Sequence, residues 1–128
     1  MPKSTTRREH RANRRTLRAA LRRRAAETRL TASVRRRPRS LATVAIAAGV
    51  DRTTAAGLAN GLRSVAKRLG VAPAETARTR RTVHGGRATR THTVAHYSLP
   101  QVRTLVAAYR PRKADYVAAR ALVAALAA

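Results

Sequence analysis

Residues 41–60 read LATVAIAAGVDRTTAAGLAN, and their pattern is the most informative in the sequence about the fold. Its apolar residues recur at helical spacing on both sides of Gly49, which predicts two helices joined by a turn. Gly49 permits the left-handed backbone conformation that follows the first helix. Asp51 can cap the second helix. Ala45 is small, which suits a point where two helices cross closely.

The same twenty residues resemble the helix-turn-helix family. The family pattern has a small residue at place five, glycine at place nine, and apolar residues at places four, eight, ten, fifteen and eighteen. In this sequence these places hold Ala45, Gly49, Val44, Ala48, Val50, Ala55 and Leu58. An ordinary helical hairpin is the alternative. The resemblance implies that a second helix over Asp51–Leu69 enters the major groove of DNA.

Under this resemblance, exposed side chains of the second helix are the candidates for reading base edges. Arg pairs with guanine, Asn pairs with adenine, and Thr or Ala methyl groups touch the thymine methyl. The candidates are Arg52, Thr53, Thr54, Ala56 and Asn60. The candidates for backbone contacts are Arg35, Arg36, Arg37, Arg39, Arg63 and Lys67. Gly57 and Gly61 weaken this helix by roughly 1 kcal/mol each relative to Ala, which indicates close helix packing or close approach to DNA.

A basic hairpin is expected after this helix. Gly70 is suited to the C-cap of this helix, and Pro73 is suited to the segment just after it, because proline cannot continue a helix. Residues 78–100 are rich in Thr and Val around Gly85-Gly86, a pair that suits a tight hairpin turn. A basic hairpin in this position resembles the wing of the winged-helix family, and the likeness covers about residues 10–110. We expect Tyr97 and Leu99 to face the core. The residues expected to contact DNA from the wing are Arg80, Arg81, His84, Arg87 and Arg90.

The N-terminal third carries most of the positive charge. The 128-residue chain has a net charge of +24, and residues 1–40 hold 15 basic and 2 acidic residues, a net of +13. We expect a disordered basic arm up to about Arg8 and a helix from about His10 to Leu30. Arg35-Arg36-Arg37-Pro38 is expected to be a linker, because the residue before proline avoids the helix.

The C-terminal part predicts two further helices. Pro100 can begin the first, and Pro111 separates it from a second over residues 112–128. That last helix is apolar on most sides, so it must fold back on the domain or pair with a second copy in a homodimer. The expected organisation is a basic arm and helix over 1–38, a winged helix-turn-helix core over 39–110, and the C-terminal helix over 111–128.

Other chemistry is not indicated. The chain has no Cys, and His92 and His96 would lie about 13 Å apart on a strand, too far to share a metal ion. The five acidic residues are scattered, so we expect neither an enzyme nor a cofactor. No apolar run suits a membrane span or signal peptide. The expected location is the cytoplasm, at the nucleoid.

Together these features predict a mostly α-helical protein with a small β-hairpin that binds double-stranded DNA. The recognition helix favours sequence-specific binding, as in a transcriptional regulator or an accessory factor for plasmid or phage replication, partition or transfer. The high charge favours the alternative of an architectural, nucleoid-associated protein with weak sequence preference. A third alternative is an RNA-binding or ribosome-associated protein.

Overall fold

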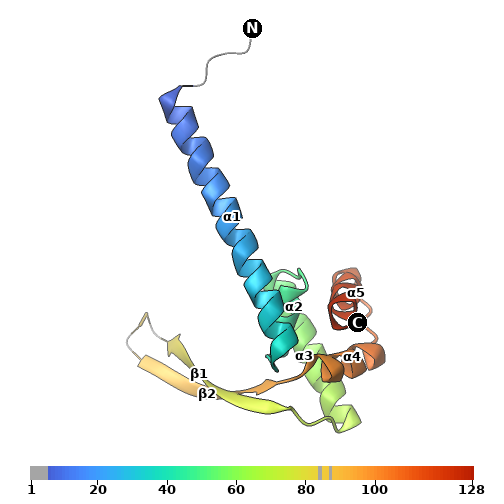
Figure 1. Ribbon diagram of the computed structural model, residues 1–128. Helices are drawn as coiled ribbons and strands as arrows, with labels where there is room; N and C mark the ends of the chain where they lie inside the picture. Colours follow the sequence, from blue (N-terminus) through green and yellow to red (C-terminus); the bar gives the residue numbers. More distant parts are fainter. Residues whose placement is uncertain (1–5, 84, 87) are drawn as a thin grey trace.

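The computed structural model describes residues 6–83, 85–86 and 88–128, which form five helices and one antiparallel hairpin (Figure 1). The prediction of a mostly α-helical fold with a small β-hairpin is confirmed. In chain order the elements are α1 (Arg7–Arg36), α2 (Leu41–Ala47), α3 (Arg52–Leu69), β1 (Glu75–Val83), β2 (Ala88–His96), α4 (Leu99–Ala108) and α5 (Ala114–Ala127).

Helix α1 is longer at both ends than the sequence suggested. Thr6 caps it by accepting a hydrogen bond from the backbone N–H of Glu9, whose side chain in turn accepts one from the Thr6 N–H. This capping box starts the helix at Arg7, so the expected arm does not reach Arg8. The prediction of a linker over residues 35–38 was also wrong, because α1 continues to Arg36. Pro38 restricts the backbone conformation only of the residue before it, Arg37, which is extended at φ −146°.

Helices α2 and α3 pack across a tight turn, as predicted. Gly49 adopts φ +99°, a left-handed conformation that glycine reaches without a Cβ clash. Asp51 then caps α3 by accepting a 3.1 Å hydrogen bond from the Thr54 N–H. Ala45 and Leu58 are buried at the contact between the two helices. Helix α3 ends at Gly70, which takes the expected left-handed cap conformation.

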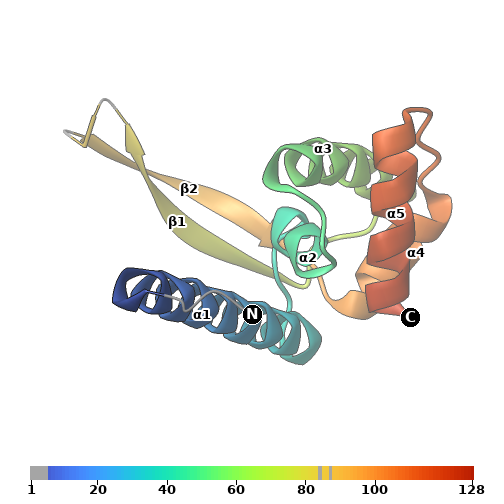
Figure 2. The same ribbon diagram turned by 90° about the horizontal axis from the view of Figure 1, so that it is seen from above.

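The hairpin extends away from the helices (Figure 2). Its register pairs Glu75 with His96 at the base and Val83 with Ala88 near the tip. Gly85 and Gly86 both have positive φ, as their place in a tight turn predicts. Just beyond the base, Arg39 and Tyr97 exchange two backbone hydrogen bonds of 3.1 and 2.9 Å. This bridge fastens the segment before α2 to the end of the hairpin.

The two C-terminal helices complete the body. Ser98 caps α4 through a second capping box with Gln101, and Pro100 stands in its first turn. Helix α5 folds back against α3 and α4 and buries Ala119, Val123 and Ala127. Of the two outcomes expected for this helix, folding back on the domain therefore explains how the face with these three residues is buried. Its opposite side leaves Val117 48% and Leu122 46% exposed.

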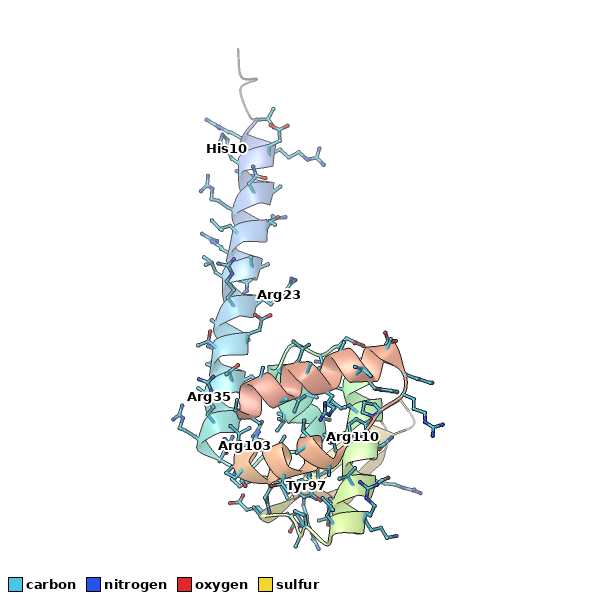
Figure 3. All side chains as sticks on the ribbon, turned by 90° about the vertical axis from the view of Figure 1, so that its right-hand side faces the viewer. His10, Arg23, Arg35, Tyr97, Arg103 and Arg110 are labelled. Carbon is cyan, nitrogen blue, oxygen red and sulfur yellow. The ribbon has the colours of Figure 1, made fainter. Side chains whose placement is uncertain are left out.

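The hydrophobic core lies among α2, α3, α4 and α5, and only the end of α1 enters it. Val34 is buried, whereas Leu17 is 61% and Leu21 is 55% exposed. Tyr97 is buried as expected, and Leu99 is half-buried against the core. Most of α1 projects beyond the body (Figures 1 and 3). The fold therefore presents three surfaces: the outer face of α3, the hairpin, and the projecting length of α1.

Candidate nucleic-acid interface

One face of α3 is exposed along its whole length and carries polar and basic side chains. Its residues follow one another at spacings of four, four, three and four, which places them in one stripe on an α-helix. They are Arg52, Ala56, Asn60, Arg63 and Lys67, and all five are exposed. We call this set the α3 stripe. Thr53, also exposed, borders it. The fold thus brings together four of the residues predicted to read base edges and two of those predicted to contact the DNA backbone.

Within this stripe, Asn60 and Arg63 are joined. Arg63 Nη1 donates a 2.7 Å hydrogen bond to Asn60 Oδ1. The bond fixes which way the Asn60 amide is turned, with its carbonyl oxygen toward Arg63. Because Asn pairs with adenine through both its oxygen and its nitrogen, an adenine contact by Asn60 would require Arg63 to share this oxygen or to leave it.

Thr54 does not belong to this exposed face. It is half-buried and lines a hollow of about 330 Å³ with Asp115, Ala118 and Leu122 of α5. Its backbone N–H donates a hydrogen bond to the Asp51 carboxylate. The structure therefore separates Thr54 from the other base-edge candidates, because helical spacing turns it toward α5 rather than outward.

The two glycines of α3 are explained by helix packing. A Cβ atom on Gly61 would lie 2.7 Å from Tyr109 Cε2 and 2.8 Å from Tyr109 Oη, and one on Gly57 would lie 2.8 Å from Tyr116 Cζ. Both tyrosines come from the α4–α5 region. Burial, and to a smaller extent the neighbouring Tyr116, raises the pKa of Tyr109. Of the two explanations considered from the sequence, close packing therefore accounts for these glycines.

Asp51 directly precedes the first residue of the α3 stripe, and its carboxylate accepts a hydrogen bond at the N-terminus of α3. Hydrogen bonds from the Thr54 hydroxyl and backbone N–H lower the pKa of its carboxyl group. Hydrogen bonds to the charged form favour that form. At neutral pH the carboxylate thus stabilises the N-terminus of α3 and leaves the guanidinium of Arg52, the next residue, exposed.

The hairpin presents further cations. Arg80 and Arg90 are exposed near the tip, and the strand register sets Arg81 opposite Arg90. His84 and Arg87, also expected to act from the wing, lie outside the described residues. Arg78 is exposed as well. It was not among the predicted wing residues, although it is two residues from Arg80 and therefore lies on the same face of β1. His92 is tied to the strand by a 3.2 Å hydrogen bond with Thr79 Oγ1.

The basic residues around Pro38 fall into two groups. Arg35 and Arg36 are exposed in the last turn of α1, and Arg37 follows as the helix cap. Arg39 is half-buried, and its backbone is paired with Tyr97. Arg37 Nε lies 3.4 Å from Ser33 Oγ. The first three therefore stand at a helix end rather than on a flexible linker.

Four other arginines cap the ends of helices, a role that could not be predicted from the sequence. Their guanidinium groups donate hydrogen bonds to carbonyl groups at the C-terminal ends of α4 and α5, where helices leave carbonyls without partners. The pairs are Arg120 with Val106, Arg110 with Ala107, Arg68 with Ala108, and Arg103 with Ala127, at donor–acceptor distances of 3.0, 2.7, 3.3 and 2.9 Å. These arginines are separate from the α3 stripe and the hairpin.

Comparison of the chain with models of protein families, with curated proteins and with solved structures gives no match. Within the described part of the chain, no three His, Asp or Glu side chains gather as a metal site would require. No helix there is long and apolar enough to cross a membrane. We therefore infer the function of the chain from the three surfaces described above.

Proposed function

We propose that this chain is a winged helix-turn-helix protein that binds double-stranded DNA in a sequence-specific manner. The observation that supports it best is the α3 stripe. It combines side chains able to read base edges, Arg52 and Asn60, with cations able to hold phosphates, Arg63 and Lys67, on one exposed helical face. A helix of this kind fits the major groove.

In this proposal the hairpin acts as the wing. Arg78 and Arg80 share one face of the hairpin, and Arg90, which pairs with Arg81, lies on the other, so the hairpin carries cations on both faces. Arginine is suited to phosphates and to the negative potential of the minor groove. The backbone bridge between Arg39 and Tyr97 supports the resemblance to the winged-helix family. It pairs the segment before α2 with the end of the hairpin, as a very short third strand would. The cellular role that fits is a transcriptional regulator or an accessory factor for plasmid or phage replication, partition or transfer.

An architectural, nucleoid-associated role is the second candidate. The observation that favours it is the density of charge on α1, which carries twelve arginines and only two acidic residues. A helix with so many cations binds phosphate backbones of any sequence. The two candidates differ in how strongly one DNA sequence is preferred over others.

A double variant tests the reading role of the α3 stripe. Changing Arg52 and Asn60 to Ala should lower affinity for a selected site by roughly tenfold or more while affinity for random duplexes falls much less, since base contacts carry discrimination. Fluorescence anisotropy with both duplexes measures this. Arg112→Ala, an exposed change on the α4–α5 loop, is the matched control. An equal loss on both duplexes would contradict the reading role.

We also propose that α5 joins two copies into a homodimer. Its exposed residues Val117, Ala118, Ala121, Leu122 and Ala125 form a face without cations, and the one charged residue beside it is the exposed Asp115. In a chain of net charge +24, this is a surface where two copies can meet without bringing cations together. Light scattering should give twice the chain mass, and Leu122→Glu should return it to the monomer mass. A monomer at tens of micromolar for the unaltered chain would contradict the dimer.

A further inference from the structure

A second basic surface runs along α1. Seven arginines follow one another at spacings of four, three, four, four, seven and seven residues, which keeps them on one side of the helix. They are Arg7, Arg11, Arg14, Arg18, Arg22, Arg29 and Arg36, and all are exposed. We call this set the α1 stripe. Figure 3 shows the side chains of α1 standing clear of the other elements over most of the helix.

The α1 stripe and the α3 stripe are on different sides of the molecule. Helix α1 approaches the body through its end, where Arg23, Ala26, Glu27 and Leu30 line a hollow with residues of α2 and the following turn. Helix α2 contacts both α1 and α3 and lies between them (Figure 2). Neither stripe is on the side of its helix that packs against α2. A duplex held by α3 therefore leaves the projecting part of α1 free.

We propose that the α1 stripe binds a second DNA duplex, so that one copy of the chain joins two DNA segments. This inference rests on the proposed function, because the first duplex is the one held by α3 and the hairpin. The positive charge of the N-terminal third then serves to bridge segments, rather than to clamp the flanks of the site that α3 reads.

The dimensions of the stripe fit a duplex. From Arg7 to Arg22 it extends roughly 22 Å at 1.5 Å per residue, which exceeds the ~12 Å width of the major groove. The helix can therefore reach the phosphates on both sides of one groove. The stripe is composed of arginine alone, and guanidinium groups bind phosphates through paired hydrogen bonds. It lacks the Asn and Thr side chains that accompany arginine on the outer face of α3, so we expect the second duplex to be bound mainly through its phosphates.

Duplex DNA suits this surface better than a partner helix does. A helical partner needs a continuous apolar seam, and the projecting part of α1 exposes only two large apolar residues, Leu17 and Leu21, which border the stripe and are too few to form one. The occupant we assign is thus a second duplex, held by charge.

A two-duplex capture assay tests the bridge. One duplex is fixed to a surface and loaded with the full chain, and a second, labelled duplex of unrelated sequence is then supplied in solution. Capture of the labelled duplex by the loaded surface, and not by the bare one, is the expected result. Binding to the fixed duplex without any capture would overturn the bridge and leave the proposed function intact. Absence of binding to the fixed duplex would overturn both.

Matched variants locate the second site. One protein carries Arg11→Gln, Arg14→Gln and Arg18→Gln together, and the other carries Arg8→Gln, Arg23→Gln and Arg24→Gln. Gln keeps helix propensity close to that of Arg, and both proteins lose the same charge from exposed positions of α1. Capture should fall by about tenfold or more in the first and much less in the second, because the first loses ordered phosphate contacts. Equal losses would overturn the assignment.

Two further measurements separate the competing explanations. The Leu122→Glu variant should still capture the second duplex, whereas loss of capture there, with capture kept in the stripe variant, would show that a dimer makes the bridge and would overturn the inference. Structured RNA captured in preference to duplex DNA would also overturn the assignment.

Discussion

Arg63 Nη1 donates a 2.7 Å hydrogen bond to Asn60 Oδ1 on the exposed face of α3. The pair joins a side chain suited to adenine with one suited to phosphate, three residues apart on one helix. It leads us to expect that the two residues contribute to DNA binding in different ways.

Asn60→Ala should relax the choice of base at one position of the site, with a loss of discrimination of ~1–3 kcal/mol. Arg63→Ala should instead weaken binding to all sequences and reduce the slope of log K against log salt by about 1, since one phosphate contact is lost. Binding isotherms on single-base variants of the site, recorded at several salt concentrations, separate the two effects. If Arg63→Ala relaxes base choice as Asn60→Ala does, the division of roles is wrong.

The hairpin should contribute affinity without sequence preference. Changing Arg78 and Arg80 to Ala is expected to reduce the salt slope by up to about 1.8, at ~0.9 per phosphate contact. Arg112 and Lys113 are exposed cations at the α4–α5 loop, and the double change to Ala there is the control of equal charge. Similar slopes for the two double variants would show that net charge, and not the hairpin surface, governs binding.

The packing of α3 against two tyrosines gives a stability prediction. Gly61→Ala should lower the free energy of unfolding by about 1–2 kcal/mol, because the new methyl group displaces the Tyr109 ring and the gain in helix propensity offsets only part of this loss. Urea unfolding measures the change. Combining it with Tyr109→Leu should cost less than the sum of the two single changes; strict additivity would mean that the ring is not what excludes the methyl group.

Stability should depend on pH through Asp51. Its folded-state pKa is lowered by hydrogen bonds from Thr54, so the carboxylate contributes stability above its unfolded pKa of about 3.9. That contribution is lost as the pH falls through the lower folded-state value. Asp51→Asn keeps an acceptor at the cap but does not titrate. Thermal midpoints of the two proteins should therefore converge as the pH falls below about 4, whereas a constant difference would contradict this role.

The sequence predicted those features that depend on neighbouring residues. The turn at Gly49, the cap at Asp51 and the glycine turn of the hairpin follow from local backbone preferences, and the structure confirms all three. The start of α1 was missed although Thr6 and Glu9 have the spacing of a capping box. The end of α1 was misplaced because the effect of Pro38 was extended beyond Arg37.

Features that depend on distant contacts could not be predicted in the same way. The partners of Gly57 and Gly61 lie about fifty residues away in the chain, at Tyr116 and Tyr109. Composition does not reveal which arginines cap helices, as Arg120 does, and which remain exposed, as Arg52 does. The regular spacing of arginines along α1 was visible in the sequence, but its separation from the α3 stripe required the fold.

We propose above all that the exposed face of α3 reads the sequence of duplex DNA. The decisive experiment is selection from a library of random duplexes, followed by competition of the selected duplex against random duplexes at fixed salt. We expect a selected motif that binds more tightly by ~10³ or more, as specific proteins do, and loss of that preference in the Arg52→Ala, Asn60→Ala protein. A preference below roughly tenfold would contradict the claim and favour an architectural role.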